Sequence, residues 1–151
     1  MVWTVGLPAE HRPADGVHRP VRRHVRDGRL ARAAVLFVFE LDGIRACHFG
    51  DFGQRELRAE QASAIGQVDL LFIPVGGGPT IGAEQAAAIC ERLSPRWVVP
   101  MHYRSPRIGF LETEKEFVSR MPEAARLDSP RFATSDLQPD RTPLTVVPAA
   151  P

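Results

Sequence analysis

The chain has 151 residues, 44% of them hydrophobic, and a formal net charge of +1 from 19 basic and 18 acidic residues. This length and apolar content suit one soluble globular unit. The near-neutral charge excludes an overall electrostatic attraction to nucleic acid or to an anionic membrane. No apolar run approaches the roughly 20 residues of a membrane span, so we expect a cytoplasmic protein.

Residues 1–32 form the first of two predicted regions. They hold seven arginines together with three prolines and three glycines, and no apolar periodicity persists among them. This pattern predicts an irregular basic segment. Because Trp3 is the only aromatic residue there, a solvated segment is favoured over one that binds nucleic acid.

Residues 33–151 form the second region, in which strand and helix patterns alternate. Apolar, β-rich runs at 33–40 and 44–49, with Asp-Gly between them, predict a β-hairpin. Helices are then expected at 55–65, 81–93 and 112–121, and strands at 68–75, 97–100 and 142–147. The resulting order is typical of a layered α/β domain.

The two cysteines, Cys47 and Cys90, stand in apolar surroundings without a CxxC spacing. Two such thiols predict buried free cysteines in a reducing compartment rather than a disulfide.

Three predicted strand ends carry residues suited to a binding site, because α/β proteins collect ligand groups where strands meet loops. Asp51 lies in a glycine-flanked turn, where it either faces a cavity or caps the turn that follows. Residues 76–78 are all glycine and lack the GxGxxG order, which favours sharp turns or close approach over a phosphate cradle. His102 follows a short strand, as a metal ligand or a structural histidine. Together, Asp51 and His102 predict a metal site.

Three segments carry a family resemblance: CHFGDFG at 47–53, IGQVDLLFIPVGGGPTI at 65–81 and PRWVVPMHY at 95–103. In order and spacing they resemble the metallo-β-lactamase superfamily, in particular the metal-dependent hydrolases related to ascorbate-phosphate lactonases. The resemblance implies part of an αββα sandwich, a sheet with flanking helices, in residues 33–151. It also implies that Asp51 is the metal-bridging aspartate and His102 the late metal histidine.

A further family histidine precedes the strand at 33–40, and His24 stands at nearly the right distance. His11 and His18 are poorer matches. The resemblance also implies residues that contact the metal ligands or form the adjoining loops: His48, Gly50, Gly76, Gly77 and Tyr103.

The family's HxHxDH segment has no counterpart, since no His-x-His occurs in the chain. This departure implies that the family's N-terminal half is missing. The leading expectation is a hydrolase of doubtful activity, in which zinc or another divalent metal such as manganese activates water against an ester, lactone, amide or phosphoester of a small molecule. The alternative is a truncated, non-catalytic interaction module that forms a homo-oligomer or binds a complementing chain.

Overall fold

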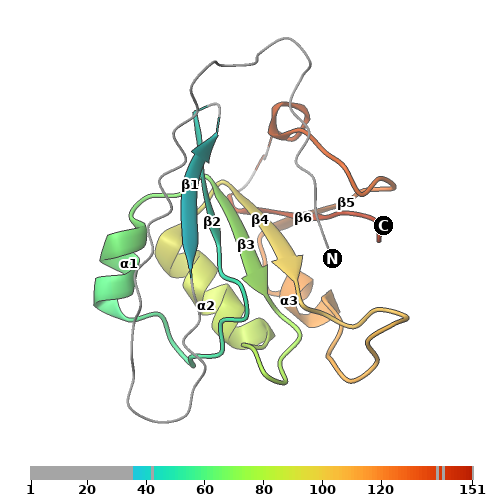
Figure 1. Cartoon of the computed structure of the whole chain (residues 1–151). Coiled ribbons are helices and arrows are strands. Elements are labelled where there is room, and N and C mark those ends of the chain that lie inside the picture. Colours follow the sequence, from blue (N-terminus) through green and yellow to red (C-terminus); the bar gives the residue numbers. More distant parts are fainter. Residues whose placement is uncertain (1–35, 42, 139, 141, 151) are drawn as a thin grey trace.

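The computed structural model describes residues 36–41, 43–138, 140 and 142–150. A six-stranded sheet of order β1-β2-β3-β4-β6-β5 forms its centre (Figure 1). Its strands are β1 Phe37–Leu41, β2 Ile44–His48, β3 Leu70–Pro74, β4 Trp97–Met101, β5 Glu123–Arg126 and β6 Leu144–Val147. The β1–β2 pair is antiparallel and the other strand pairs are parallel.

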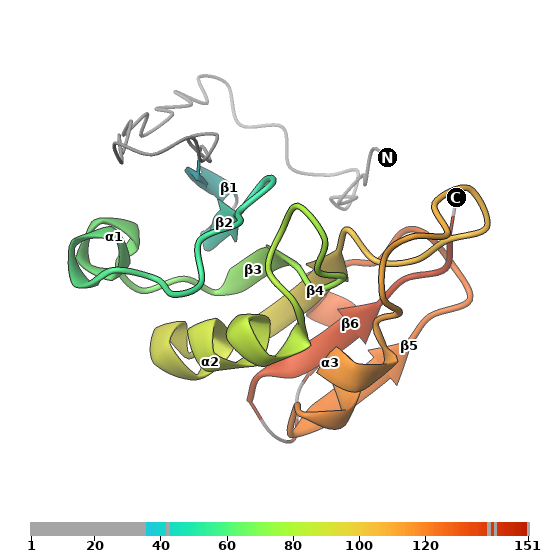
Figure 2. The same cartoon turned by 90° about the horizontal axis from the view of Figure 1, so that it is seen from below.

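The helices are α1 Ala59–Ile65, α2 Ala83–Leu93, α3 Lys115–Ser119 and the 3-10 helix η1 Thr134–Asp136. Within the described ranges, none of them combines the length and apolar character needed to cross a membrane. Helices α2 and α3 lie side by side against one face of the sheet (Figure 2). The predicted α/β architecture of a sheet with flanking helices is therefore confirmed.

Helices α1 and α2 begin later than the sequence predicts because a glutamine side chain accepts the N–H of the residue before each helix. The backbone N–H of Arg58 donates to Gln61 Oε1 at 2.9 Å, immediately before α1. The N–H of Gly82 likewise donates to Gln85 Oε1 at 3.2 Å, immediately before α2. Each glutamine thus satisfies an N–H at the helix start, which fixes the boundary there rather than at residue 55 or 81.

Strand β5 was not predicted, because Glu-Ala-Ala-Arg is a helix-favouring sequence. In the structure it forms the edge of the sheet, paired in parallel with β6 from Glu123↔Leu144 to Arg126↔Val147. Pairing with a buried neighbouring strand overrides local propensity.

The predicted hairpin is confirmed, with β1 and β2 in register from Phe37↔His48 to Leu41↔Ile44. Gly43 has a φ of 77°, a left-handed conformation that favours glycine in a tight turn. Its neighbour Asp42 lies outside the described residues.

Strands β3 and β4 are buried along their whole length and form the centre of the core. This agrees with the two apolar runs, at 68–75 and 97–100, that predicted them. Only the first of them contains a charged residue. Asp69, the one charged residue of that run, lies just before β3, where its Oδ2 accepts the N–H of Arg45 at 2.8 Å. Its carboxylate therefore joins the beginnings of β2 and β3 instead of interrupting the core.

Both cysteines are free and buried, as the sequence predicts. Burial raises the pKa of the Cys47 and Cys90 thiols from 9.0 to about 12.

Because the thiolate is the reactive form, we expect iodoacetamide at pH 8 to alkylate the folded chain at least about 100-fold more slowly than the urea-unfolded chain, as followed by mass spectrometry. Above pH 9 the unfolded thiols ionise while the folded ones stay protonated, so stability falls as pH rises. Rapid alkylation of the folded chain would contradict this assignment.

Candidate metal centre

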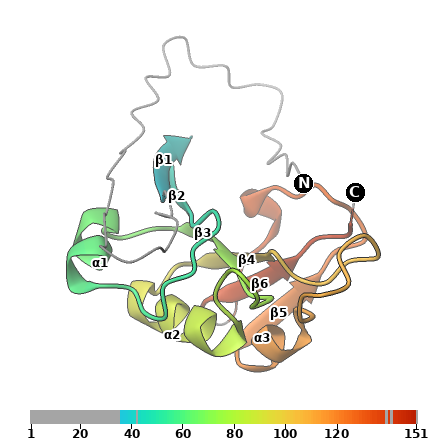
Figure 3. The ribbon, with the colours of Figure 1, turned by 60° about the horizontal axis from the view of Figure 1, so that its bottom comes forward.

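Asp51 and His102 meet at the carboxyl edge of the parallel strands. Asp51 follows β2 and His102 follows β4, while β3 lies between these two strands. The loops after all three strands leave the sheet at the same edge (Figure 3). There, His102 Nε2 lies 2.9 Å from Asp51 Oδ1. The structure therefore brings together the two side chains that the sequence singles out as a pair.

The triple glycine after β3 is packed between the segments that carry this pair. A Cβ on Gly76 would overlap the carbonyl oxygen of His102 and lie 2.8 Å from the Cα of Tyr103. On the other side, the N–H of Ile81 donates to the carbonyl oxygen of Phe52 at 2.9 Å. Gly77 has a φ of 68°. The glycines thus allow close backbone approach and a left-handed turn, the interpretation favoured over a phosphate cradle.

His102 has a φ of 52°, which places a residue other than glycine in the left-handed region. This conformation costs about 1 kcal/mol or more, and such residues are concentrated at functional sites. The His102 side chain is 41% exposed and that of Asp51 is 75% exposed. A strained backbone thus presents the imidazole at an edge that solvent and small molecules can reach.

His48, the last residue of β2, supports the turn that leads to Asp51. Its Nδ1 accepts the N–H of Gly50 at 3.0 Å, and Gly50 takes the left-handed turn at a φ of 52°. Burial, and then the nearby His102, lower the pKa of His48 from 6.5, while Asp51 opposes them. A neutral imidazole that accepts at Nδ1 carries its proton on Nε2, which leaves no free lone pair for a metal. This geometry favours a structural role.

Tyr103 is half-buried and packs against the hydrophobic core. Burial and the Glu114 carboxylate raise the pKa of its hydroxyl, and Arg126 opposes them. Glu114 Oε1 and Arg126 Nη1 lie 2.8 Å apart. Tyr103 thus lies close enough to this ion pair for both of its charges to act on the pKa of the hydroxyl.

The Asp51–His102 pair fits two positions of a metal site. Two ligands of one tetrahedral zinc lie about 3.4 Å apart, from bond lengths of about 2.1 Å, so the observed pair needs to open only slightly. In the part of the chain that the structure describes, no group of three or more His, Cys, Asp or Glu residues is arranged to hold a metal. His11, His18 and His24 lie outside the described residues.

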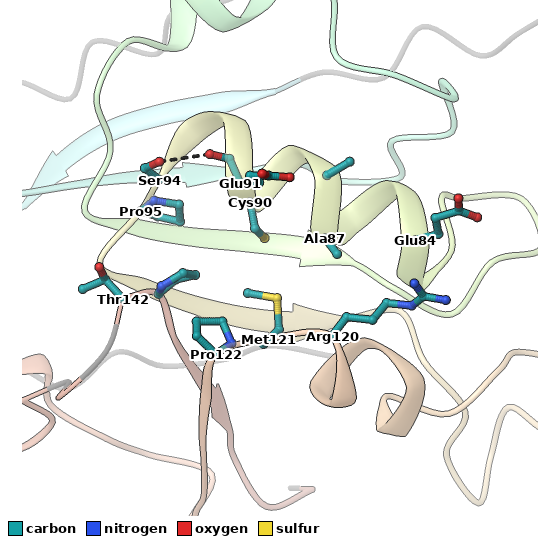
Figure 4. Close-up of a pocket in the computed structure, with 12 residues that line it drawn as sticks. Glu84, Ala87, Cys90, Glu91, Ser94, Pro95, Arg120, Met121, Pro122 and Thr142 are labelled. Carbon is teal, nitrogen blue, oxygen red and sulfur yellow. Dashed lines mark hydrogen bonds between the residues drawn. The ribbon is translucent and has the colours of Figure 1, made fainter.

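A separate pocket of about 520 Å³ lies between α2 and the segment that joins α3 to β5 (Figure 4). Helix α2 forms one wall, and Arg120, Met121 and Pro122 form the opposite one. Neither Asp51 nor His102 lines it. The sequence holds no signal for this pocket because its walls are distant along the chain.

Ile108 and Phe110, in the loop after His102, are exposed, and neither is among the predicted site residues. Their signal was present: two large apolar residues stand in a loop otherwise rich in arginine, serine, proline and glycine.

Comparisons with known proteins identify the class of proteins that has this fold and this candidate site. Residues 6–102 match the family model described as a β-lactamase superfamily domain. A protein from Thermotoga maritima described as a Zn-dependent hydrolase of the metallo-β-lactamase superfamily has a similar structure, with a TM-score of 0.59 and 30% identity over 76% of this chain and 58% of that one. The chain belongs to the metallo-β-lactamase superfamily.

Within the superfamily, the chain is similar to proteins named UPF0173 metal-dependent hydrolase. The relative from Thermococcus onnurineus is 37% identical over 111 residues, which cover 69% of this chain and 48% of the relative. The relative from Thermococcus kodakarensis is 36% identical over 107 residues, which cover 69% of this chain and 42% of the relative. The chain thus spans about half the length of these curated relatives.

Proposed function

We propose that the chain is a metal-dependent hydrolase unit in which Asp51 and His102 hold one divalent cation, zinc or manganese. The observation that carries this proposal is the 2.9 Å approach of His102 Nε2 to Asp51 Oδ1 across the loop of the intervening strand. The printed names of the relatives, as metal-dependent hydrolases, support the same chemistry.

His24 is the proposed third ligand, because a hydrolytic zinc site needs at least three protein ligands and an open position. Position 24 falls within the residues 6–102 that match the family model, which supports this choice. His11 and His18 fall within the same range and are the alternatives to His24 as the third ligand.

A bound metal lowers the pKa of a water molecule toward about 7 and polarises the bond that is broken. The chain's own residues do the positioning. Gly76 lets His102 approach the loop after β3, and His48 holds the turn before Asp51. The exposure of both candidate ligands leaves room for a small-molecule ester, lactone, amide or phosphoester.

Zinc binding tests the proposal directly. After dialysis against zinc, elemental analysis of the full chain is expected to show near-stoichiometric metal. Asp51→Ala and His102→Ala are each expected to weaken zinc binding by at least about 100-fold, and His24→Ala similarly, because each removes a direct ligand.

The matched controls are His48→Ala, His11→Ala and His18→Ala, which are expected to retain zinc within about tenfold because none of them removes a proposed ligand. Zinc content that is unchanged in both Asp51→Ala and His102→Ala would remove their proposed roles and the proposed function with them.

A second candidate function follows from the number of metal ligands. Among the described residues, the candidate site has two, Asp51 and His102, rather than three. In that case the chain is a non-catalytic module that associates with itself or with a complementing chain. Sedimentation of the purified chain separates the two: a zinc-loaded monomer supports the hydrolase, and a metal-free oligomer supports the module.

A further inference from the structure

The loop that follows His102 forms a short arm, residues 104–112. The N–H of Arg104 donates to the carbonyl oxygen of Glu112 at 2.8 Å, and Ser105 and Ile108 exchange backbone hydrogen bonds at 3.1 and 3.0 Å. Arg104 Nε also donates to the carbonyl oxygen of Leu111 at 2.7 Å. These bonds between the two branches give the arm a defined backbone.

The arm is anchored to the loop that packs against His102. The N–H of Glu112 donates to the carbonyl oxygen of Gly76 at 2.9 Å, and Leu111 is buried. A Cβ on Gly78 would lie 3.2 Å from Leu111 Cδ2 and 3.9 Å from Phe110 Cε2. The Phe110 ring therefore lies beside the same glycine loop that contacts the backbone of His102.

Phe110 is 76% exposed and Ile108 is 41% exposed, although both are large and apolar. Among the described residues, Phe37 is the only other exposed large apolar side chain. It pairs in register with His48, the last residue of β2, and so lies at the same edge of the sheet. Ile108 and Phe110 belong to the arm that follows His102, and Phe37 lies beside the last residue of β2, so all three stand on segments that adjoin the strand ends carrying Asp51 and His102. Small-molecule sites usually combine apolar side chains with a few polar groups.

We infer that Phe110 and Ile108 contact an apolar group of the substrate, so that the preferred substrate carries an aromatic or branched aliphatic group next to the bond that is hydrolysed. This inference rests on the proposed function, because it places the reacting bond at the Asp51–His102 pair. A substrate of that class buries its apolar group against the ring of Phe110 while its polar bond faces the metal ligands.

Two small chelators test the inference without requiring turnover. Acetohydroxamate and benzohydroxamate bind zinc through the same head group and differ in a methyl against a phenyl substituent. Calorimetry of the zinc-loaded chain is expected to show benzohydroxamate binding about tenfold more tightly, a ratio typical of one buried aromatic contact. Phe110→Ala is expected to reduce the preference to less than about threefold, whereas Phe110→Leu, which keeps an apolar side chain, retains most of it.

Arg107→Ala is the matched control, because it removes an exposed side chain from the same arm and should leave the preference unchanged. If zinc and acetohydroxamate bind but Phe110→Ala keeps the full preference, this inference is overturned while the proposed function stands. If the chain binds no zinc, the proposed function fails and the inference fails with it. Loss of a dimer in Phe110→Ala with an unchanged preference would instead assign the arm to contact between copies.

Discussion

Gly76→Ala is expected to lower the free energy of unfolding by about 3 kcal/mol, a large effect for one added methyl group. The new Cβ would overlap the carbonyl oxygen of His102 and lie 2.8 Å from the Cα of Tyr103. Both are backbone atoms, so the strain cannot be relieved by rotating a side chain. The ends of β3 and β4 must separate, which moves His102 away from Asp51. Urea denaturation measures the loss, and the same variant should bind zinc more weakly.

Gly77→Ala is the matched control at the next position. A Cβ there meets no atom within 4 Å, but the φ of 68° is unfavourable for alanine. The expected loss is therefore only about 1 kcal/mol, from the left-handed backbone. Equal losses in the two variants would show that the close approach of Gly76 to His102 does not exist in solution.

Phe52→Ala is expected to destabilise the chain by about 4 kcal/mol, because the substitution leaves a cavity where a fully buried ring had packed. Phe52 is 0% exposed and packs edge-to-face against Phe49, with ring centroids 5.1 Å apart. The two rings stand on either side of Asp51 in the chain and hold its turn against the core. The variant should therefore lose stability, as measured by urea denaturation, and zinc affinity, as measured by dialysis against zinc.

Phe110→Ala provides the comparison for stability, because it removes the same ring from a side chain that is 76% exposed. Its expected change is within about 0.5 kcal/mol, the usual range for exposed positions. A loss as small as this in Phe52→Ala would contradict the buried position of that ring and its support of Asp51.

The candidate metal pair was predictable in part, because each residue has a local signal. Asp51 follows a strand in a glycine-flanked turn, and His102 follows the apolar run of β4. Their approach to 2.9 Å depends on β2, β3 and β4 running parallel, so that their ends share one edge. The sequence marks Ile108 and Phe110 as apolar residues in a polar loop, but their exposure could not be predicted, because it depends on what the rest of the chain covers.

The sequence by itself determined the strand and helix pattern from β1 to α3, the buried free thiols and the strand ends at which Asp51 and His102 stand. These features follow from apolar periodicity and turn residues, which act over a few positions. Only the tertiary structure decided that β6 enters the sheet between β4 and β5, and that the helix-favouring residues 123–126 become a strand. It also decided which loops meet around Gly76. Those outcomes depend on hydrogen bonds and packing between segments distant along the chain, which no local pattern records.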